Sequence, residues 1–303
     1  MKITIVGAGA MGSLFGAMLS QDGQEVLLVD KRCEQVEAIN RNGITILYPD
    51  GSEERIKARA ACEPVEAGDA DLVILLVKSY DTEQALQDCL SVIGSHTTVL
   101  TLQNGLGNIE KISSIVGQGR VIAGTTSYGC CALGPGRIAL SNRGEVTLGE
   151  IDGQLSARIQ ELAGLFQARG IQVQLSDNIA GVIWTKLAVN VGINAITAIT
   201  SLKNGQLLAQ KETQQLMELA IEELLQVARC RGITLLADPV LLARQVAQST
   251  FSNKSSMLQD LECGRKTEID SINGAVAAEG GKAGVETPVN QVLTLLIKIL
   301  ENK

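Results

Sequence analysis

Apolar positions in the first half of the chain follow two alternating patterns. Short apolar runs that are typical of strands recur, and stretches with helical spacing, such as residues 11–20, separate them. Unbroken apolar runs suit parallel strands that are buried on both faces. The alternation of strands and helices predicts a doubly wound α/β sheet. The predicted strands cover residues 3–6, 24–29, 71–77 and 98–102.

The pattern becomes richer in β-structure further along. Residues 43–60 are predicted to form a hairpin insertion with its turn at residues 49–51. Residues 120–149 are β-rich with many glycines, which suits mixed strands that extend the sheet. A helix and then a strand at residues 171–175 are expected to close this part of the chain.

Only helical patterns appear from about Asp177 onward. With 303 residues the chain has room for two domains of roughly 150 residues each. We therefore predict an α/β fold in which a doubly wound domain over residues 1–177 precedes an all-helical domain over residues 178–303.

The charge and hydropathy of the chain argue against some classes of partner. Its formal net charge is −7, whereas a nucleic-acid-binding protein normally carries a basic face. No apolar run reaches the ~18 residues expected of a membrane span. The N-terminus breaks into glycines where a signal peptide would stay apolar. We therefore expect a cytoplasmic protein with neither a nucleic-acid nor a membrane partner.

Cysteine and histidine usage argues against metal chemistry. The chain has seven cysteines, an odd number with no CxxC pair, and a single histidine, His96. A disulfide framework, a metal site or a histidine-based triad is therefore not expected. We expect the cysteines to be small hydrophobic residues in buried or half-buried places. The sequence assigns no role to Cys130, Cys131 or His96.

A glycine-rich turn follows the first predicted strand and opens the first predicted helix. In that context a G-x-G-x-x-G run is the fingerprint of a dinucleotide-binding Rossmann unit. Gly7 permits the tight turn, Gly9 lets the backbone approach a pyrophosphate, and Gly12 allows close packing of helix on strand. A turn that merely links strand to helix is the alternative. The predicted cofactor-binding residues of this turn are Gly7, Ala8, Gly9, Ala10, Met11 and Gly12.

The end of the second predicted strand bears on cofactor choice. Asp30 would hydrogen-bond the ribose of NAD and repel the 2′-phosphate of NADP, whereas Lys31 and Arg32 would bind that phosphate. We expect NADPH, bound by Lys31 and Arg32 with Asp30 turned away; NADH stays open because of Asp30. A solvated loop is the alternative for the two basic residues. Lys78 ends another predicted strand at the ligand crevice, with a surface lysine as its alternative.

A nearly all-apolar segment over residues 181–194 predicts a buried helix. It carries Lys186, Asn190 and Asn194 at i, i+4 and i+8, so these side chains form one stripe along the helix. Buried polar groups need partners, and a ligand in a cleft would supply them. A solvent-facing stripe with an extended lysine is the alternative.

Residues 251–260 contain a predicted helix start. Ser252 or Asn253 is the expected N-cap, which places Ser255 and Ser256 in the first turn. Such a start can bind an anion such as a substrate carboxylate, although simple capping is the alternative. The acids of residues 267–270, further along, are most simply the solvated face of another helix.

Together these motifs resemble the ketopantoate reductase (2-dehydropantoate 2-reductase) family over essentially the whole chain. Four separated motifs in the right order are more specific than a single fingerprint. The matching stretches are GAGAMG at residues 7–12, LQNGLG at 102–107, residues 184–194, and the run formed by 255–260, 267–270 and 272–274.

The resemblance implies an oxidoreductase that reduces 2-dehydropantoate to (R)-pantoate with NADPH, a step toward pantothenate and coenzyme A. Lys186 would be the catalytic general acid, and Glu268 would hydrogen-bond and position the substrate. Lys78 would lie near the cofactor, and Asn104 near the nicotinamide ribose and the substrate. Ser256 would bind the substrate carboxylate. The other implied substrate-binding residues are Asn190, Asn194, Asn204 and Asn253.

Two alternative functions stay open at this point. The first is a reductase of another branched 2-keto acid with the same mechanism, because related members reduce such substrates. Cofactor choice also stays open, because the family often has a basic residue after its second strand without the acid seen here as Asp30. A non-catalytic NAD(P)-binding regulator is the second alternative, although such a sensor needs no proton donor like Lys186. The long helices of the second half could bury a homodimer interface, which the sequence does not decide.

Overall fold

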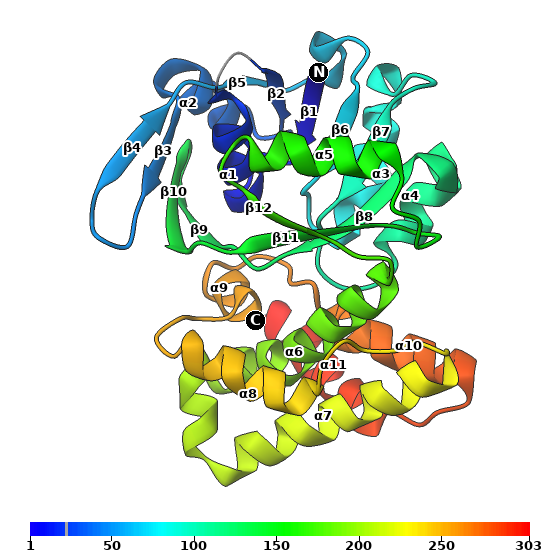
Figure 1. The fold of residues 1–303 in the computed structure, drawn as a ribbon. Coiled ribbons are helices and arrows are strands. Elements are labelled where there is room, and N and C mark those ends of the chain that lie inside the picture. The colour runs from blue at the N-terminus through cyan, green and yellow to red at the C-terminus, as the bar shows by residue number, and fades with distance from the viewer. Residues whose placement is uncertain (22–23) are drawn as a thin grey trace. The chain divides into compact units, whose positions relative to one another are not determined.

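The computed structural model describes residues 1–21 and 24–303. The chain forms two compact units (Figure 1). Unit 1 contains Met1–Gln103 and Asn108–Ile179, and unit 2 contains Asn104–Gly107 and Ala180–Lys303.

Unit 1 is built on an eight-stranded sheet. The strands run in the order β12-β11-β8-β7-β6-β1-β2-β5, and every pair is parallel except β8 with β11. This arrangement confirms the predicted doubly wound sheet. Its strands are β1 (Lys2–Val6), β2 (Glu25–Val29), β5 (Arg59–Ala61), β6 (Leu72–Leu75), β7 (Thr98–Thr101), β8 (Val121–Thr126), β11 (Glu145–Glu150) and β12 (Gln172–Leu175).

Each face of this sheet has its own hydrophobic core. On one face, Ile3 and Ile5 of β1 pack in a cluster with Phe15 and Phe166, whose ring centroids lie 6.1 Å apart. On the other face, Val6 belongs to a second cluster. Side chains of a strand alternate between the two faces of the sheet, so an unbroken apolar strand contributes residues to both cores. The helices of this unit are α1 (Ala10–Leu19), α2 (Cys33–Asn42), α3 (Thr82–Asp88), α4 (Asn108–Val116) and α5 (Ala157–Gln167).

A second, four-stranded sheet contains the predicted hairpin. The hairpin is β3 (Ile44–Leu47) and β4 (Glu53–Ile56), as predicted. However, β9 (Gly129–Gly134) and β10 (Arg137–Asn142) join this sheet in the order β4-β3-β10-β9 and do not extend the main one. Only β8 and β11 extend the main sheet, which corrects the expectation for residues 120–149. The reason is burial, because alternate apolar residues of β3 and β10 pack into the core cluster around Phe15.

Unit 2 is helical, as predicted for the second half of the chain. Its central helix, α6 (Ile179–Thr200), is apolar on nearly every side, with a mean hydropathy of 1.5 over its most apolar window. This helix is long and apolar enough to cross a membrane, although the sequence suggested no such run; 72% of that window is buried, as in the core helix of a folded domain. The other helices are α7 (Lys211–Cys230), α8 (Pro239–Ser249), α9 (Ser256–Glu262), α10 (Asn273–Ala283) and α11 (Pro288–Glu301), with 3₁₀ turns η6 (Asn204–Ala209) and η7 (Ile269–Ser271).

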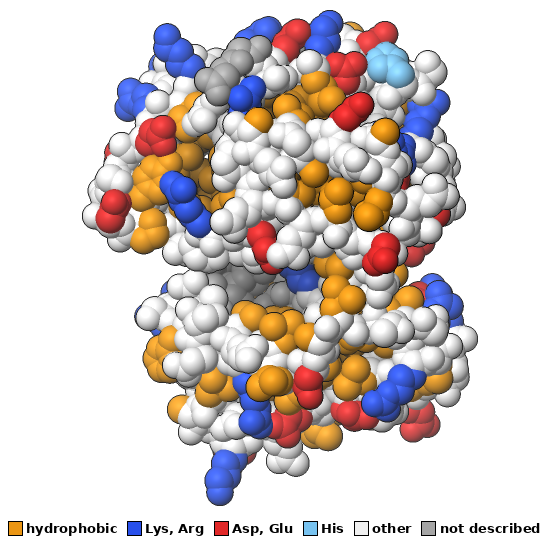
Figure 2. Space-filling model, viewed as in Figure 1, with side chains coloured by type: hydrophobic (Ala, Val, Ile, Leu, Met, Phe, Trp, Pro, Cys, Tyr) orange, Lys and Arg blue, Asp and Glu red, His pale blue; other side chains and the backbone are white. Residues whose placement is uncertain are grey.

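The surface carries mixed side chains. On the face drawn in Figure 2, hydrophobic side chains lie among charged side chains of both signs. Several large apolar side chains of unit 2 stay exposed, including Leu241 at 55% and Leu295 at 61%.

One short loop belongs to unit 2 although its flanking residues belong to unit 1. The Leu106 N–H donates a hydrogen bond of 2.9 Å to the Ser271 carbonyl oxygen. Gly105 has φ +80 and lies so close to Ser271 that a Cβ would overlap the same oxygen. The sequence prediction included this loop in the domain of residues 1–177. The loop groups with unit 2 because it contacts Ser271, which is distant in sequence. The functional division into a cofactor domain and a substrate domain stays a prediction.

Candidate functional site

The glycine turn after β1 has the geometry that its fingerprint requires. Gly7 has φ +97, and a Cβ there would lie 2.8 Å from the Val77 amide nitrogen. A Cβ at Gly12 would overlap the Gly7 carbonyl oxygen, so only glycine allows α1 to pack this closely on the turn. A Cβ at Gly9 would meet no described atom within 4 Å. The backbone at Gly9 is therefore open to the approach of a ligand.

The start of α1 suits an anion. Gly9 is the N-cap and has no side chain to accept a hydrogen bond, and the first turn contains no acid. The first N–H groups of a helix need acceptors, and the helix dipole favours negative charge there. The pyrophosphate of a dinucleotide supplies both. The turn therefore fits such a cofactor.

Asp30, at the carboxyl end of β2, faces the glycine turn. Its Oδ2 accepts a hydrogen bond of 2.8 Å from the Ala8 N–H. Both of its oxygens accept hydrogen bonds from the Arg32 guanidinium, each at 2.8 Å. Burial favours the neutral acid, but the hydrogen bonds and charge of Arg32 outweigh it and lower the pKa of Asp30. Asp30 is therefore a buried carboxylate beside the turn.

This geometry corrects the expectation that Asp30 is turned away. Arg32 is bound by Asp30, and Lys31 lies 3.3 Å from Asp81 with 79% of its side chain exposed. The Asp30 N–H donates to the Ala61 carbonyl at 3.2 Å, which holds the backbone of this residue beside β5. The carboxylate then points toward the glycine turn. The two basic residues are thus paired with acids before any phosphate binds.

Lys78 lies at the same edge of the sheet. It is partly buried and caps the 3₁₀ turn η3 (Ser79–Asp81), which follows β6. In the sheet β6, β1 and β2 are neighbours and parallel. Their carboxyl ends therefore bring Lys78, the glycine turn and Asp30 to one edge, where open α/β sheets bind ligands.

Two glutamines that the sequence did not single out hold this edge together. The Gln35 Nε2 donates to the Ala8 carbonyl at 2.7 Å, and its Oε1 accepts from the Gly136 N–H at 3.1 Å. The Gln103 Nε2 donates to the Val77 carbonyl at 2.9 Å. Gln103 lies within the LQNGLG motif of residues 102–107, whereas nothing in the sequence marks Gln35 beyond its being a polar residue on an apolar helix face.

In unit 2, α6 carries Lys186 in a partly buried position. Burial disfavours the ammonium and lowers the pKa of Lys186 to about 8, while the negative charge of Glu268 opposes that fall. Glu268 is only 7% exposed. A lysine with this pKa is a stronger acid than an ordinary lysine and is still mostly protonated at neutral pH.

The polar stripe of α6 continues from Lys186. Asn190 is partly buried and Asn194 is 6% exposed. The stripe is therefore not a solvent-facing one. Whether a ligand meets these side chains stays a prediction.

A second group of polar residues surrounds the start of α9. Asn204 is 8% exposed; its Nδ2 donates to the Thr250 hydroxyl at 2.9 Å, and its Oδ1 has no hydrogen-bond partner among the described residues. The Asn204 N–H donates to the Asn253 carbonyl at 3.0 Å, which joins the two asparagines. The unpaired Oδ1 and the exposed Ser256 are groups that a ligand could engage.

The N-cap of α9 is Ser255, and neither Ser252 nor Asn253 caps the helix. The Ser255 Oγ accepts from the Leu258 N–H at 3.1 Å and from the Thr197 hydroxyl of α6 at 2.7 Å. The hydrogen bond from Thr197 of α6 favours Ser255 as the cap. The local sequence does not reveal this contact. Ser256 is consequently the first residue of α9.

The acids of residues 267–270 are not a solvated helix face. Glu268 is buried and precedes η7, while Asp270 is exposed and its Oδ1 lies 2.6 Å from the Lys298 ammonium. The Thr267 N–H donates to the Glu301 carboxylate of α11 at 2.7 Å. This tertiary contact orders a short turn where helical spacing predicted a helix.

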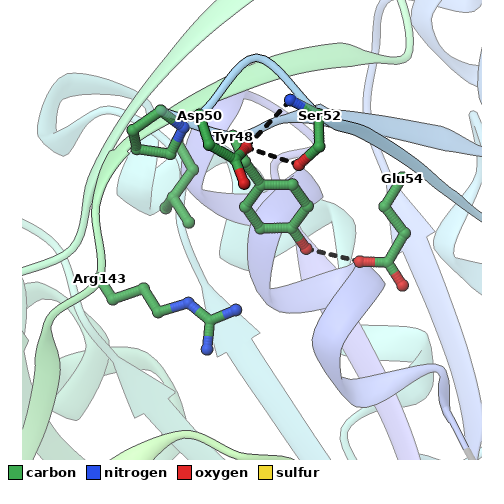
Figure 3. A pocket seen from close by; sticks show the side chains of 7 residues that line it. Tyr48, Asp50, Ser52, Glu54 and Arg143 are labelled. Carbon is green, nitrogen blue, oxygen red and sulfur yellow. Dashed lines mark hydrogen bonds between the residues drawn. The ribbon is translucent and has the colours of Figure 1, made fainter.

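A pocket of about 540 Å³ lies on the second sheet of unit 1. Its lining includes Tyr48, whose hydroxyl donates to Glu54, with the Arg143 guanidinium 6.0 Å from the ring centroid (Figure 3). Burial and Glu54 raise the pKa of Tyr48 to about 12, so its phenol stays protonated at neutral pH. None of the predicted site residues lines this pocket.

The cysteines differ from the expectation that all are buried or half-buried. Cys33, Cys230 and Cys263 are exposed. Burial raises the pKa of Cys89 and of Cys130 to about 12, so both thiols stay protonated. In the described part of the chain, no three His, Cys, Asp or Glu side chains form a group that could hold a metal ion.

A mostly parallel sheet with a glycine turn at the carboxyl end of β1 defines a Rossmann-type dinucleotide-binding protein. The family model "Ketopantoate reductase PanE/ApbA" matches residues 3–153, and its C-terminal counterpart matches residues 178–301. The chain therefore belongs to the ketopantoate reductase family, whose members are NAD(P)H-dependent oxidoreductases.

Individual relatives agree with this assignment. The chain is 35% identical to a 2-dehydropantoate 2-reductase from Halobacterium salinarum, over 99% of each chain. A PanE/ApbA family ketopantoate reductase from Ralstonia eutropha superposes with a TM-score of 0.92 and 34% identity, covering 100% of this chain and 99% of that one. A D-mandelate dehydrogenase solved with NADH and anilino(oxo)acetate gives the same TM-score, identity and coverage.

Proposed function

We propose that this protein reduces 2-dehydropantoate to (R)-pantoate with a reduced nicotinamide dinucleotide, a step toward pantothenate and coenzyme A. The observation that carries the proposal is Lys186, partly buried on α6 beside the charge of Glu268, with its pKa lowered to about 8. Full-length relatives named 2-dehydropantoate 2-reductase support the choice of substrate.

The proposed chemistry assigns one role to each charged residue. When bound, the reduced nicotinamide supplies the hydride that the ketone carbon accepts. Lys186 donates a proton to the carbonyl oxygen and stabilises the negative charge that develops there. Glu268 hydrogen-bonds the substrate and, through its charge, keeps Lys186 protonated.

Amide and hydroxyl groups would orient the substrate. Asn190 and Asn194 continue the stripe that begins at Lys186, and Ser256 at the start of α9 would bind the carboxylate. Asn204 would contribute its unpaired Oδ1, and Asn253 is joined to it through the backbone. Asn104, in the loop that packs on Ser271, would lie near the substrate and the nicotinamide ribose.

The cofactor in this proposal is NADPH, with NADH accepted as well. Residues 7–12 would hold the pyrophosphate, and Lys78 would lie nearby. Lys31 and Arg32 would bind a 2′-phosphate. Asp30 works against that contact, because it already binds Arg32 and would repel the phosphate.

Replacing Asp30 with alanine is expected to raise the preference for NADPH over NADH on the order of 10-fold, because a like charge near the 2′-phosphate is removed. The measurement is the ratio of kcat/KM for the two cofactors. Asp30→Asn is the matched control, since the amide oxygen can still accept from the Ala8 N–H while the charge is gone. An unchanged ratio in both variants would show that Asp30 does not meet the ribose.

The proposed activity is tested by following NADPH and NADH absorbance with a panel of 2-keto acids. We expect ketopantoate to give a higher kcat/KM than 2-ketoisovalerate and 2-ketoisocaproate. If another branched 2-keto acid gave the highest kcat/KM, the proposed mechanism would stand and the assigned substrate would change. Protein that binds NADPH and turns over none of the panel would favour a non-catalytic regulator.

A second candidate substrate comes from the structural neighbour. The D-mandelate dehydrogenase matches this fold as well as the ketopantoate reductase does. We therefore include phenylglyoxylate, the 2-keto acid of mandelate, in the panel. A kcat/KM for phenylglyoxylate above that for ketopantoate would assign the protein to 2-hydroxy-acid oxidation and reduction of aromatic substrates.

We also infer a cytoplasmic homodimer. The long apolar helix α6 has 72% of its most apolar window buried, as expected for a protein that stays in solution. Helix α11 leaves Val292, Leu295 and Ile299 between 54% and 61% exposed, and their spacing places them on one stripe. A second copy of the chain would bury this stripe.

A further inference from the structure

Two cysteines that are distant in sequence lie side by side in unit 1. Cys33 is the first residue of α2, and Cys62 directly follows β5. The Cys62 thiol donates to the Cys33 sulfur across 3.2 Å. A disulfide has an S–S length of ~2.05 Å, so the sulfurs need to approach by roughly 1.2 Å. That displacement is within reach of side-chain rotation and a small backbone shift.

The two sulfurs differ in access. Cys33 is exposed and Cys62 is partly buried. The hydrogen bond to Cys33, together with burial, raises the pKa of Cys62 to about 11, so Cys62 keeps its proton at neutral pH. Cys33 is therefore the sulfur that an incoming reagent meets first, and Cys62 is placed to react second.

The pair adjoins the segments that hold Asp30. Cys33 follows Arg32, which binds the Asp30 carboxylate. Cys62 follows Ala61, whose carbonyl accepts from the Asp30 N–H at 3.2 Å. β5 and α2 lie against each other (Figure 1). A covalent link between the two sulfurs would therefore displace both segments that hydrogen-bond Asp30, at Arg32 and at Ala61.

We propose that Cys33 and Cys62 form a reversible disulfide by exchange with low-molecular-weight disulfides, and that this bond weakens dinucleotide binding. The Cys33 thiolate attacks one sulfur of the reagent, forms a mixed disulfide and releases one thiol. The Cys62 sulfur, after losing its proton to solvent, attacks Cys33, and the second thiol leaves. The protein is oxidised by two electrons, and the reagent is reduced to two thiols. The effect on dinucleotide binding rests on the proposed function, whereas formation of the bond does not.

Oxidised glutathione is the probe for bond formation. We expect Cys33 and Cys62 to lose two of the seven thiols of the chain without retaining glutathione, with a linked peptide containing both residues in the digest. In the Cys62→Ser variant the reaction should stop at the mixed disulfide, with one glutathione attached to Cys33. A Cys230→Ser/Cys263→Ser variant should still lose two thiols, which separates this pair from the other exposed cysteines. Absence of the linked peptide in wild-type protein would overturn the proposal.

Dinucleotide binding by the oxidised and reduced protein is the second readout. We expect the Kd of NADPH to rise roughly three-fold or more on oxidation, to return with dithiothreitol, and to stay constant in Cys33→Ser. An oxidised protein with the linked peptide and an unchanged Kd would overturn the switch. If reduced protein bound no dinucleotide, the proposed function would fail, while the peptide map would still decide whether the disulfide forms.

Discussion

Lys186→Ala is expected to lower kcat for ketone reduction by on the order of 10²–10⁴, with the Kd of the dinucleotide changed by less than about three-fold. The reason is that Lys186 lies on α6, in unit 2, and supplies the proton in the proposed mechanism. The glycine turn and Asp30 are untouched by this substitution. Steady-state kinetics with ketopantoate and titration of NADPH fluorescence measure the two effects.

Two controls separate chemistry from packing. Lys186→Met keeps much of the side-chain volume and should lose as much activity as alanine does. Lys211→Ala, at an exposed lysine of α7, should leave kcat unchanged. A Lys186→Ala variant with near wild-type turnover would remove this residue from the mechanism.

The pH dependence gives an independent check on Lys186. Its pKa is about 8, and the protonated form is the acid. In wild-type protein kcat for reduction should therefore fall as pH rises through about 8, and kcat for the reverse oxidation, which needs the neutral amine, should rise. The same inflection in Lys186→Ala would assign it to another group.

Gly9→Ala is expected to leave folding intact and to weaken dinucleotide binding at least about 10-fold. The backbone at Gly9, with φ −67 and ψ −161, accepts an alanine without strain, and the added methyl would enter space free of described atoms. That space is where the pyrophosphate would approach. Thermal unfolding should shift by less than about 2 °C.

Gly12→Ala is the contrasting substitution. Its methyl group would overlap the Gly7 carbonyl oxygen, which is backbone and has no rotamer to change. We expect destabilisation of about 1–3 kcal/mol or more in addition to lost binding. Normal NADPH affinity in Gly9→Ala would show that the turn only links strand to helix.

Local sequence was sufficient for features that depend on neighbouring residues. The strands predicted at residues 3–6, 24–29, 71–77 and 98–102 correspond to β1, β2, β6 and β7, and the glycine positions follow from the spacing of a single turn. The buried character of α6 follows from its composition. Each of these depends on residues within one turn or one strand of each other.

Long-range contacts decided what local patterns left open. β9 joined the second sheet because its partner β10 pairs with β3, far away in sequence. Ser255 became the cap of α9 because Thr197 of α6 reaches it. Glu268 became buried because its neighbour Thr267 bonds to α11. Apolar spacing contains no information about these partners.

The amino-acid sequence by itself determined the class of fold, the glycine turn as a candidate dinucleotide site and Lys186 as the candidate acid. Only the tertiary structure decided that Asp30 faces the turn and binds Arg32, that Glu268 lies close enough to act on Lys186, and that Cys33 meets Cys62. The physical reason is that hydrogen bonding and desolvation depend on distances between side chains. Those distances are set when distant segments pack, and spacing along the chain does not encode them.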